Sequence, residues 1–346
     1  MKKSVLILMV LMVTSSLNAQ QWTLVTDLRG QWKFEIGESN KFADPAFNDS
    51  DWEDIFVPSS WEDEGFQGYD GYAWYRKKVK ISSSQKGKPL YLHLGNVDDA
   101  SEVYINGNFL SYAGKFPPHY ITAYETYQTH PIPEKYINYD KENVIAVKVF
   151  DAQLAGGIVN GKVGLFVMSD YPKMDVRLSE TWKFATGDDM DWKEPDFNDS
   201  KWENITVPAY WETQGYEDYD GIAWYRTAFK ISAKLAEENL MLMMGKIDDF
   251  DEVYVNGKLV GKTGRIPRKN RDFEASEDFK EIRSYPLPSE LLKTDGENVI
   301  AVRVYDRLIQ GGIYDGPIGI LTKKEFANWE DKRGNRGKYK FFEKLF

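Results

Sequence analysis

Short runs of alternating hydrophobic and polar residues, separated by turn signals, recur along this chain. Residues 89–94 alternate around three leucines, residues 102–105 lead into Asn106-Gly107, and residues 144–150 form a third, β-branched run. Successive side chains of a strand point to opposite faces, so this pattern indicates half-buried strands. Asn-Gly between two such runs predicts a tight hairpin, because a type I′ turn needs positive φ at both central residues. No segment shows a sustained helical period, and the pattern therefore predicts an all-β fold.

The sequence pattern occurs twice along the chain. Across residues 47–82, 22 of 36 positions are identical to those 150 residues later, and residues 142–147 match residues 297–302 at an offset of 155. Asn256-Gly257 repeats the hairpin signal. A period of 150 residues is a domain duplication, since solenoid repeats run about 20–50 residues. Many short strands with turns between them predict two tandem jelly-roll β-sandwich domains, which we place at residues 20–170 and 171–322.

The two ends of the chain lie outside the repeat. Lys2 and Lys3 precede nine apolar residues, 5–13, and small residues follow up to Ala19. Nine apolar residues are too few to span a bilayer, which needs about 20, so residues 1–19 are predicted to be a cleavable signal peptide. There is no cysteine for a lipid anchor or a disulfide, and we expect a periplasmic or secreted protein. Residues 323–346 are basic but rich in aromatics, which predicts a tail packed partly on the second domain; disorder is the alternative.

The negative net charge of the chain argues against two classes of binding partner. The formal net charge is −10, with 54 acidic against 44 basic residues. Nucleic acids and anionic membrane surfaces bind basic faces, so neither is an expected partner. Aromatic residues make up 15% of the chain, and their flat rings suit both sandwich cores and sugar surfaces.

The motifs inside the repeat resemble those of a known domain. Val57-Pro58, Trp61-Glu62, Gly65-Phe66 and residues 73–76 (Ala-Trp-Tyr-Arg) resemble the sugar-binding jelly-roll domain of glycoside hydrolase family 2. Residues 245–257 are similar to the related domain inserted in sialate O-acetylesterases. The resemblance covers residues 22–322 and implies a galactose-binding-like fold. A fold of this kind hosts unrelated functions, so it does not by itself identify an activity or a sugar.

The resemblance does not extend to the catalytic parts of either enzyme family. In family 2 enzymes the catalytic carboxylates lie on a TIM barrel of about 250 residues, and no such segment remains outside the two repeats. Residues 37–40 (Gly-Glu-Ser-Asn) resemble the serine block of the esterases, but a serine nucleophile needs a positioned base. The second copy has Gly187-Asp188-Asp189 instead, and none of the three histidines stands three residues after an Asp. We therefore expect a protein that is not an enzyme and name no catalytic residue.

Candidate sugar ligands lie where strands end. The resemblance implies that Asp151 and Asp306, which follow the Val-rich strand of each copy, touch a sugar, since a carboxylate accepts hydrogen bonds from vicinal hydroxyls. The alternative, weighed evenly, is that each Asp caps its own turn. Asp70 and Asp220 are further candidate sugar-binding residues.

Adjacent acids precede the hairpin of each copy. Asp98-Asp99 and Asp248-Asp249 could bind a sugar or a structural Ca²⁺, which takes oxygen ligands, and Asp98 and Asp248 are the weak metal candidates. Adjacent strand residues point to opposite faces, which favours a purely structural role. No other cofactor is expected.

The two copies differ most in the loop after the hairpin. In the first copy residues 115–133 hold aromatic residues, of which Tyr120 and Tyr124 are candidates for stacking on a sugar. In the second copy Arg268 and Arg271 lie in a basic cluster, which would suit a uronate or sulfated sugar because arginine pairs bidentately with such anions. A solvated basic loop is the alternative.

Other prominent residues are predicted to be structural. Arg76 and Arg226 are expected to be buried against a carboxylate. The tryptophans of the repeated motifs are expected in the core rather than in a binding platform, and they are Trp61, Trp74, Trp211 and Trp224.

Three functions remain after these observations. The first is an exported, non-catalytic carbohydrate-binding protein that assists polysaccharide or glycoside degradation, with a neutral or an anionic oligo- or polysaccharide as its partner. The second is a family 2-like or acetylesterase-related hydrolase, or an accessory subunit associated with a glycoside hydrolase. The third is a structural spacer or docking module.

Overall fold

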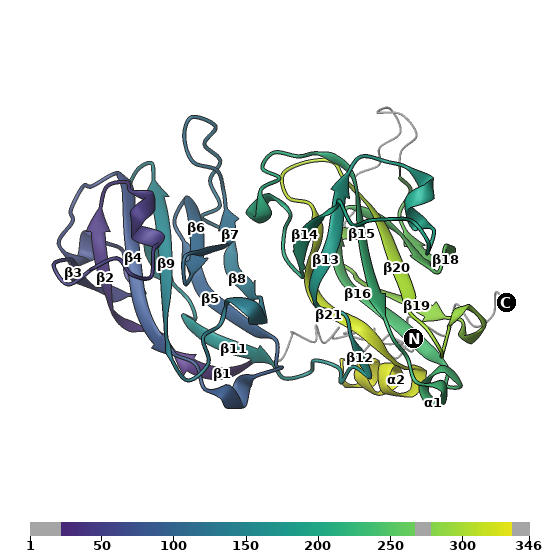
Figure 1. Cartoon of the computed structure of the whole chain (residues 1–346). Helices are drawn as coiled ribbons and strands as arrows, with labels where there is room; N and C mark the ends of the chain where they lie inside the picture. Colours follow the sequence, from purple (N-terminus) through teal and green to yellow (C-terminus); the bar gives the residue numbers. More distant parts are fainter. Residues whose placement is uncertain (1–21, 267–277, 334–346) are drawn as a thin grey trace, which may run out of the picture.

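A computed structural model describes residues 22–266 and 278–333, which form two β-sandwiches side by side (Figure 1). Each sandwich consists of two antiparallel sheets. The fold class predicted from the sequence, all-β with tandem sandwiches, is confirmed. Among the described residues no helix is long and apolar enough to cross a membrane.

The first sandwich contains strands β1 to β11. Its six-stranded sheet has the order β3-β2-β4-β9-β6-β7, and its five-stranded sheet has the order β1-β11-β5-β10, with β8 also paired to β5. The strands are β1 Trp22–Asp27, β2 Gly30–Ile36, β3 Glu53–Val57, β4 Gly71–Lys80, β5 Leu90–Val97, β6 Ala100–Ile105, β7 Asn108–Ala113, β8 Tyr127–Ile132, β9 Glu142–Asp151, β10 Ile158–Asn160 and β11 Gly164–Met168.

The second sandwich repeats this arrangement. Its six-stranded sheet has the order β14-β13-β15-β20-β17-β18, and its four-stranded sheet has the order β12-β21-β16-β19. The elements are β12 Val176–Arg177, β13 Glu180–Thr186, β14 Glu203–Val207, β15 Gly221–Phe229, β16 Leu240–Asp248, β17 Phe250–Val255, β18 Lys258–Thr263, β19 Ile282–Leu287, β20 Asn298–Asp306, β21 Gly312–Thr322, and the helices α1 Ala233–Ala236 and α2 Lys323–Lys332. In the first sandwich two strands, β10 and β11, pair with β5. In the second sandwich the single long strand β21 takes both places beside β16, the equivalent of β5.

Each core lies between the two sheets of one sandwich. Leucines of β5 meet Trp32 and Phe34 of β2 in the first core, and residues of β16 meet Trp182 and Phe184 of β13 in the second. Trp61, Trp74, Trp211 and Trp224 are fully buried, which confirms the core role predicted for them.

The predicted hairpins and buried arginines are present. Asn106 and Gly107 have φ values of 50° and 77° between β6 and β7, as an Asn-Gly turn requires. Arg76 Nε donates to Asp49 at 2.8 Å, and Arg226 Nε donates to Asp199 at 2.8 Å. Both guanidinium groups also donate to loop carbonyls, so each ion pair ties a loop to the six-stranded sheet.

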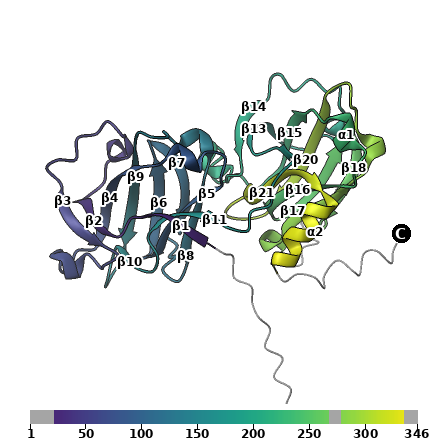
Figure 2. The same cartoon turned by 90° about the horizontal axis from the view of Figure 1, so that it is seen from below.

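The sequence pattern missed helix α2, the longer of the two α-helices in the described residues. Helix α2 packs on the outer face of the four-stranded sheet, where Phe326 and Trp329 bury against Met241, Met243 and Leu321 (Figure 2). Thr322 caps the helix by accepting from Glu325 N. The expectation of no helical segment is wrong here, because ten residues with only two core-facing aromatics carry a weak periodic signal. The predicted signal peptide, residues 1–19, and the end of the tail lie outside the described residues.

The two sandwiches touch through polar side chains. Tyr112 donates to Ile309 O at 3.0 Å, Lys115 pairs with Asp218 at 3.0 Å, and Tyr91 donates to Asp315 at 2.9 Å. These contacts place one end of the first sandwich against the loops of the second.

Candidate functional site

The two strand-end aspartates occupy equivalent buried positions. Asp151 ends β9 opposite Gly71, and Asp306 ends β20 opposite Gly221. In each, Oδ1 accepts from the backbone N–H two residues later, Gln153 in one case and Leu308 in the other. Both carboxyls are fully buried, and Oδ2 of each lacks a hydrogen-bond partner among the described residues. The turn-capping alternative therefore accounts for one oxygen of each Asp and leaves the other unexplained.

Burial has a clear electrostatic effect on this pair. Desolvation raises the pKa of Asp151 and of Asp306 to about 7 each. Neighbouring carboxylates add to the shift, including Asp70 beside Asp151 and Asp220 beside Asp306. The structure thus brings Asp70 and Asp220, both exposed, near the two strand-end aspartates.

A glutamate in each copy joins the site and was missed by the sequence analysis. Glu62 starts the short 3₁₀ helix Glu62–Glu64, and Glu212 starts its equivalent, Glu212–Gln214. Each uses one oxygen to accept from a glycine N–H, Gly156 or Gly311, and the other oxygen has no hydrogen-bond partner within residues 22–266 and 278–333. Burial raises the pKa of Glu212 to about 8. The available signal was the repeated Trp-Glu pair within the motif.

The adjacent aspartates do not behave as strand residues. Asp248 is the last residue of β16 and Asp249 lies beyond it, so the alternation of a strand does not apply. Carboxylate oxygens of Asp248, Asp249 and Asp306 all lie within 4.8 Å of one another. The expectation of opposite faces is therefore wrong in the second copy. In the first copy Asp99 accepts from Ala152 N at 2.7 Å, and Asp98 accepts from Asp99 N at 3.0 Å.

The predicted aromatic loop is shorter than expected. Residues 127–132 form β8, and His130 is buried there against Gln128, where burial lowers its pKa to about 3. His130 therefore belongs to the core and does not rim a binding face. The sequence missed this strand because Pro131 and two polar residues interrupt its alternation.

Tyr120 and Tyr124 lie on the remaining loop and are exposed. Tyr120 interacts with the Asp99 carboxylate, which together with burial raises the pKa of the phenol to about 12. Tyr124 donates to Glu125 at 2.9 Å. Arg268 and Arg271, the candidates in the second copy, lie outside the described residues.

A cleft of about 310 Å³ runs between the sandwiches next to these groups. Its wall on the first sandwich carries Phe109, Tyr112, Phe116 and His119, and its wall on the second carries Glu212, Glu217 and Asp218. Tyr112 and Phe109 stack with ring centroids 6.3 Å apart. Phe116 also contacts Phe150, the residue before Asp151.

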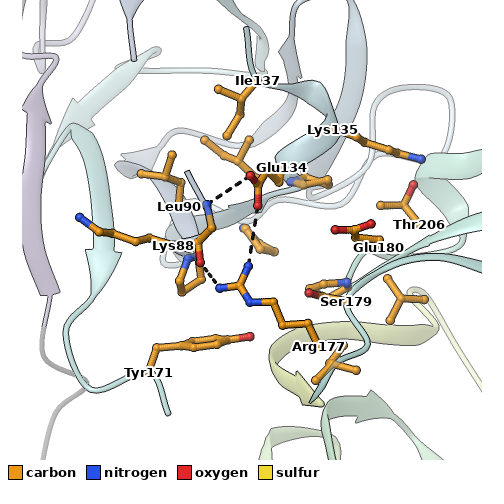
Figure 3. A pocket seen from close by; sticks show the side chains of 18 of the residues that line it. Lys88, Leu90, Glu134, Lys135, Ile137, Tyr171, Arg177, Ser179, Glu180 and Thr206 are labelled. Atoms are coloured by element: carbon orange, nitrogen blue, oxygen red, sulfur yellow. Dashed lines mark hydrogen bonds and ion pairs between the residues drawn. The ribbon is translucent and has the colours of Figure 1, made fainter. Parts of the chain in front are cut away.

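A second interdomain cavity, of about 390 Å³, is lined by apolar and charged side chains, among which Arg177 and Glu134 pair with each other (Figure 3). Arg177 donates to Gly87 O and lies 3.9 Å from Glu134, which accepts from Gly87 N. These contacts fasten the two sandwiches together. The 310 Å³ cleft, with aromatic rings on one wall and the exposed carboxylates of Glu217 and Asp218 on the other, is the better candidate for ligand binding.

One family model matches the chain in two places. The model described as the β-galactosidase second all-beta domain matches residues 37–154 and residues 186–307, together well over half of the chain. The chain belongs to this family. Each match lies within one sandwich, so the β-galactosidase second all-beta domain occurs here twice. This confirms the resemblance to the all-β domains of family 2 glycoside hydrolases.

Similar curated proteins are glycosidases. A Bacteroides ovatus β-galactosidase is 31% identical over 140 residues, which cover 37% of this chain and 15% of that protein. A putative β-glucuronidase of Formosa agariphila is 34% identical over 137 residues, 36% of this chain and 12% of that protein. The chain therefore matches only a small part of each relative.

Among solved structures, a Bacteroides uniformis β-glucuronidase is 19% identical, with a TM-score of 0.36 over 83% of this chain and 28% of that chain. A likeness this low has no bearing on function.

The two buried histidines lie away from the serine motif in this member of the β-galactosidase second all-beta domain family. Ser39 precedes a 3₁₀ turn beside the six-stranded sheet, and the neighbouring Glu38 pairs with Lys148 at 2.6 Å. His93 and His130 lie in the five-stranded sheet, where burial lowers their pKa values to about 4 and about 3. Neither buried imidazole is placed to serve Ser39.

Proposed function

We propose that this chain is an exported, non-catalytic carbohydrate-binding protein that assists glycoside or polysaccharide degradation. It binds an oligosaccharide in the 310 Å³ cleft between its two sandwiches. The family assignment and the glycosidase relatives support an accessory role beside a glycoside hydrolase.

The observation that carries the proposal is the contrast between the two walls of the cleft. Phe109 and Tyr112 are half-buried rings, and apolar ring faces pack against the C–H face of a pyranose. Across the cleft, the exposed Glu217 and Asp218 supply carboxylate oxygens as acceptors. Sugar hydroxyls donate to carboxylates in charge-assisted hydrogen bonds. A cleft with an apolar wall and a few fixed polar groups is the usual form of a small-molecule site.

The charge of the cleft favours a neutral sugar. Glu102, Glu217 and Asp218 line it, against Lys115, which already pairs with Asp218. A uronate or sulfate group there would meet like charges. An anionic sugar, as suggested by Arg268 and Arg271, would therefore need to bind elsewhere, and the described cleft suits the uncharged part of a chain.

A glycan array with the chain lacking residues 1–19, followed by calorimetry on the strongest ligands, tests the proposal. Phe109→Ala should weaken binding tenfold or more, about 1.4 kcal/mol, because it removes a ring from the cleft wall. Leu259→Ala, the equivalent position of the second copy, is exposed outside the cleft and should leave the affinity unchanged. Equal effects of the two variants, or no glycan bound at all, would contradict the proposal and favour a spacer role.

A screen against chromogenic glycosides and acetyl esters separates the binder from a hydrolase. We expect no turnover above buffer. Turnover that Ser39→Ala abolishes would replace the proposed function with an esterase activity.

A further inference from the structure

The second sandwich holds a set of carboxylates that the first does not. Asp248, Asp249 and Asp306 each bring an oxygen within 4.8 Å of the other two. Asp248 ends β16 of the four-stranded sheet, Asp306 ends β20 of the six-stranded sheet, and Asp249 lies in the bend after β16. No other group of three or more His, Asp or Glu side chains in residues 22–266 and 278–333 meets this distance.

Two buried carboxylate oxygens, one in this set and one from Glu212, have no hydrogen-bond partner in the described part of the chain. Asp306 is fully buried, and its Oδ2 accepts no hydrogen bond from the described part of the chain. Glu212 is 4% exposed, its Oε2 is likewise without a partner there, and its charge acts on both Asp248 and Asp306. A buried anionic oxygen is costly unless something neutralises it. Several such carboxylate oxygens close together are stable only if a bound cation or bound protons neutralise their negative charge.

We propose that Asp248, Asp249 and Asp306 bind a divalent cation, and that this cation is Ca²⁺. Calcium takes oxygen ligands at about 2.3–2.6 Å, so the oxygens of one coordination sphere lie within about 5 Å of one another. The three carboxylates satisfy this limit without rearrangement. Asp248 and Asp249 are half-exposed, so water completes a sphere of six to eight ligands from that side. Mg²⁺ binds oxygens at about 2.0–2.1 Å in a strict octahedron and fits this wider set less well.

The first sandwich provides an internal comparison. Its equivalent residues are Asp98, Asp99 and Asp151, and they do not converge within the same distance. Asp99 Oδ2 accepts from Ala152 N at 2.7 Å, and its carboxylate also interacts with Tyr120. In the second sandwich the matching bond, from Arg307 N to Asp249 Oδ2, is longer, at 3.3 Å. The same three positions therefore build a cation site in one copy and a hydrogen-bonded turn in the other.

The cation site goes beyond the proposed carbohydrate binding and does not depend on it. Calorimetric titration of CaCl₂ into chelator-treated protein at pH 7.5, without sugar, measures it directly. We expect one site per chain and a melting temperature that rises with CaCl₂ concentration, because a ligand of the folded state stabilises it. MgCl₂ should bind at least tenfold more weakly.

Variants locate the site. Asp306→Asn should weaken Ca²⁺ binding tenfold or more. Because residue 306 is buried, Asp248→Asn at a half-exposed position provides a second variant, with circular dichroism to confirm folding. Asp151→Asn, the matched change in the first sandwich, should retain wild-type Ca²⁺ affinity.

Two outcomes would overturn the proposal. One is the absence of heat and of any melting shift in the unmodified protein up to millimolar CaCl₂, which would mean that protons neutralise the cluster. The other is an equal loss from Asp151→Asn and Asp306→Asn. Either result leaves carbohydrate binding in the cleft to be judged separately, by the Phe109→Ala comparison.

Discussion

At the scale of single residues, the main finding is a buried carboxylate at the end of the same strand in both copies. Asp151 accepts one backbone hydrogen bond with Oδ1, and its Oδ2 has no hydrogen-bond partner among the described residues. Burial raises its pKa from about 3.8 to about 7. The folded protein therefore keeps a proton there that the unfolded chain releases, and this difference links stability to pH.

We predict that Asp151→Asn removes part of the pH dependence of stability. Stability associated with a raised carboxyl pKa is fully present below about pH 4 and is lost as the pH rises through about 7. At pH 8 the variant should be more stable than the parent by about 2 kcal/mol, roughly half of the ~4 kcal/mol that the full pKa change represents, because water screens part of the effect. At pH 4 the two should be equal. Urea unfolding of both proteins from pH 4 to pH 8 measures this difference.

Asp70→Asn, at an exposed position beside the same site, is the control and should change the profile little. A constant stability difference between Asp151→Asn and the parent at all pH values would contradict the assigned protonation.

At the scale of elements, the two copies fill one equivalent place between their sheets with different chemistry. In the first sandwich Ser101 of β6 donates to Gln128 of β8 at 2.9 Å. In the second, Arg283 of β19 donates to Asp251 of β17 at 2.8 Å, and Tyr285 donates to the same carboxylate at 2.6 Å. A neutral pair has thus been exchanged for a fully buried ion pair within one architecture.

This exchange predicts that removing Arg283 alone destabilises the protein more than removing Arg283 and Asp251 together. Arg283→Gln should cost about 3–5 kcal/mol, because it leaves the Asp251 carboxylate buried without its cation. Adding Asp251→Ser, which recreates the residues of the first copy, should recover at least about 1 kcal/mol. Chemical denaturation of the single and double variants tests this, and a double variant less stable than Arg283→Gln would show that the ion pair is not the source of the loss.

At the scale of the whole molecule, the candidate sugar site exists only because the two sandwiches meet. Lys115 and Tyr112 of the first copy reach Asp218 and Ile309 of the second, beside the cleft. On the other side of the joint, Tyr91 bonds Asp315 and Arg177 bonds Gly87 O. The repeat therefore produces a composite cleft in addition to two equivalent strand-end sites.

We predict that Lys115→Glu combined with Tyr112→Phe loosens this joint. The change places like charges at residues 115 and 218 and removes the hydroxyl that bonds Ile309. Solution X-ray scattering should show a larger radius of gyration, and glycan affinity should fall, while each sandwich stays folded. Lys230→Glu, an equal change of charge at an exposed site of the second sandwich, should do neither. Unchanged scattering from the double variant would mean that the remaining contacts alone hold the domains.

Much of the fold follows from local patterns. Asn106-Gly107 predicted a hairpin because the positive φ angles of the turn depend only on those two residues. Trp61 and Trp211 could be assigned to the core because burying a large aromatic ring is strongly favourable. Strand β8 and helix α2 were missed, since their burial comes from distant partners such as β5 and Met241. Glu62 and Glu212 were missed for the same reason: nothing next to them in sequence shows an unpartnered oxygen beside Asp151 or Asp306.

The sequence by itself determined that one sandwich is built twice, because strand alternation, turn residues and repeated motifs act over a few neighbouring positions. It also indicated that Asp151 and Asp306 matter, since both follow the same strand. Only the tertiary structure decided which groups meet. It joins Asp306 to Asp248 and Asp249 but keeps Asp151 from forming such a set, and it places Phe109 opposite Glu212. These outcomes depend on contacts between residues far apart in the chain, where differences in hydrogen bonding and packing distinguish two nearly identical sequences.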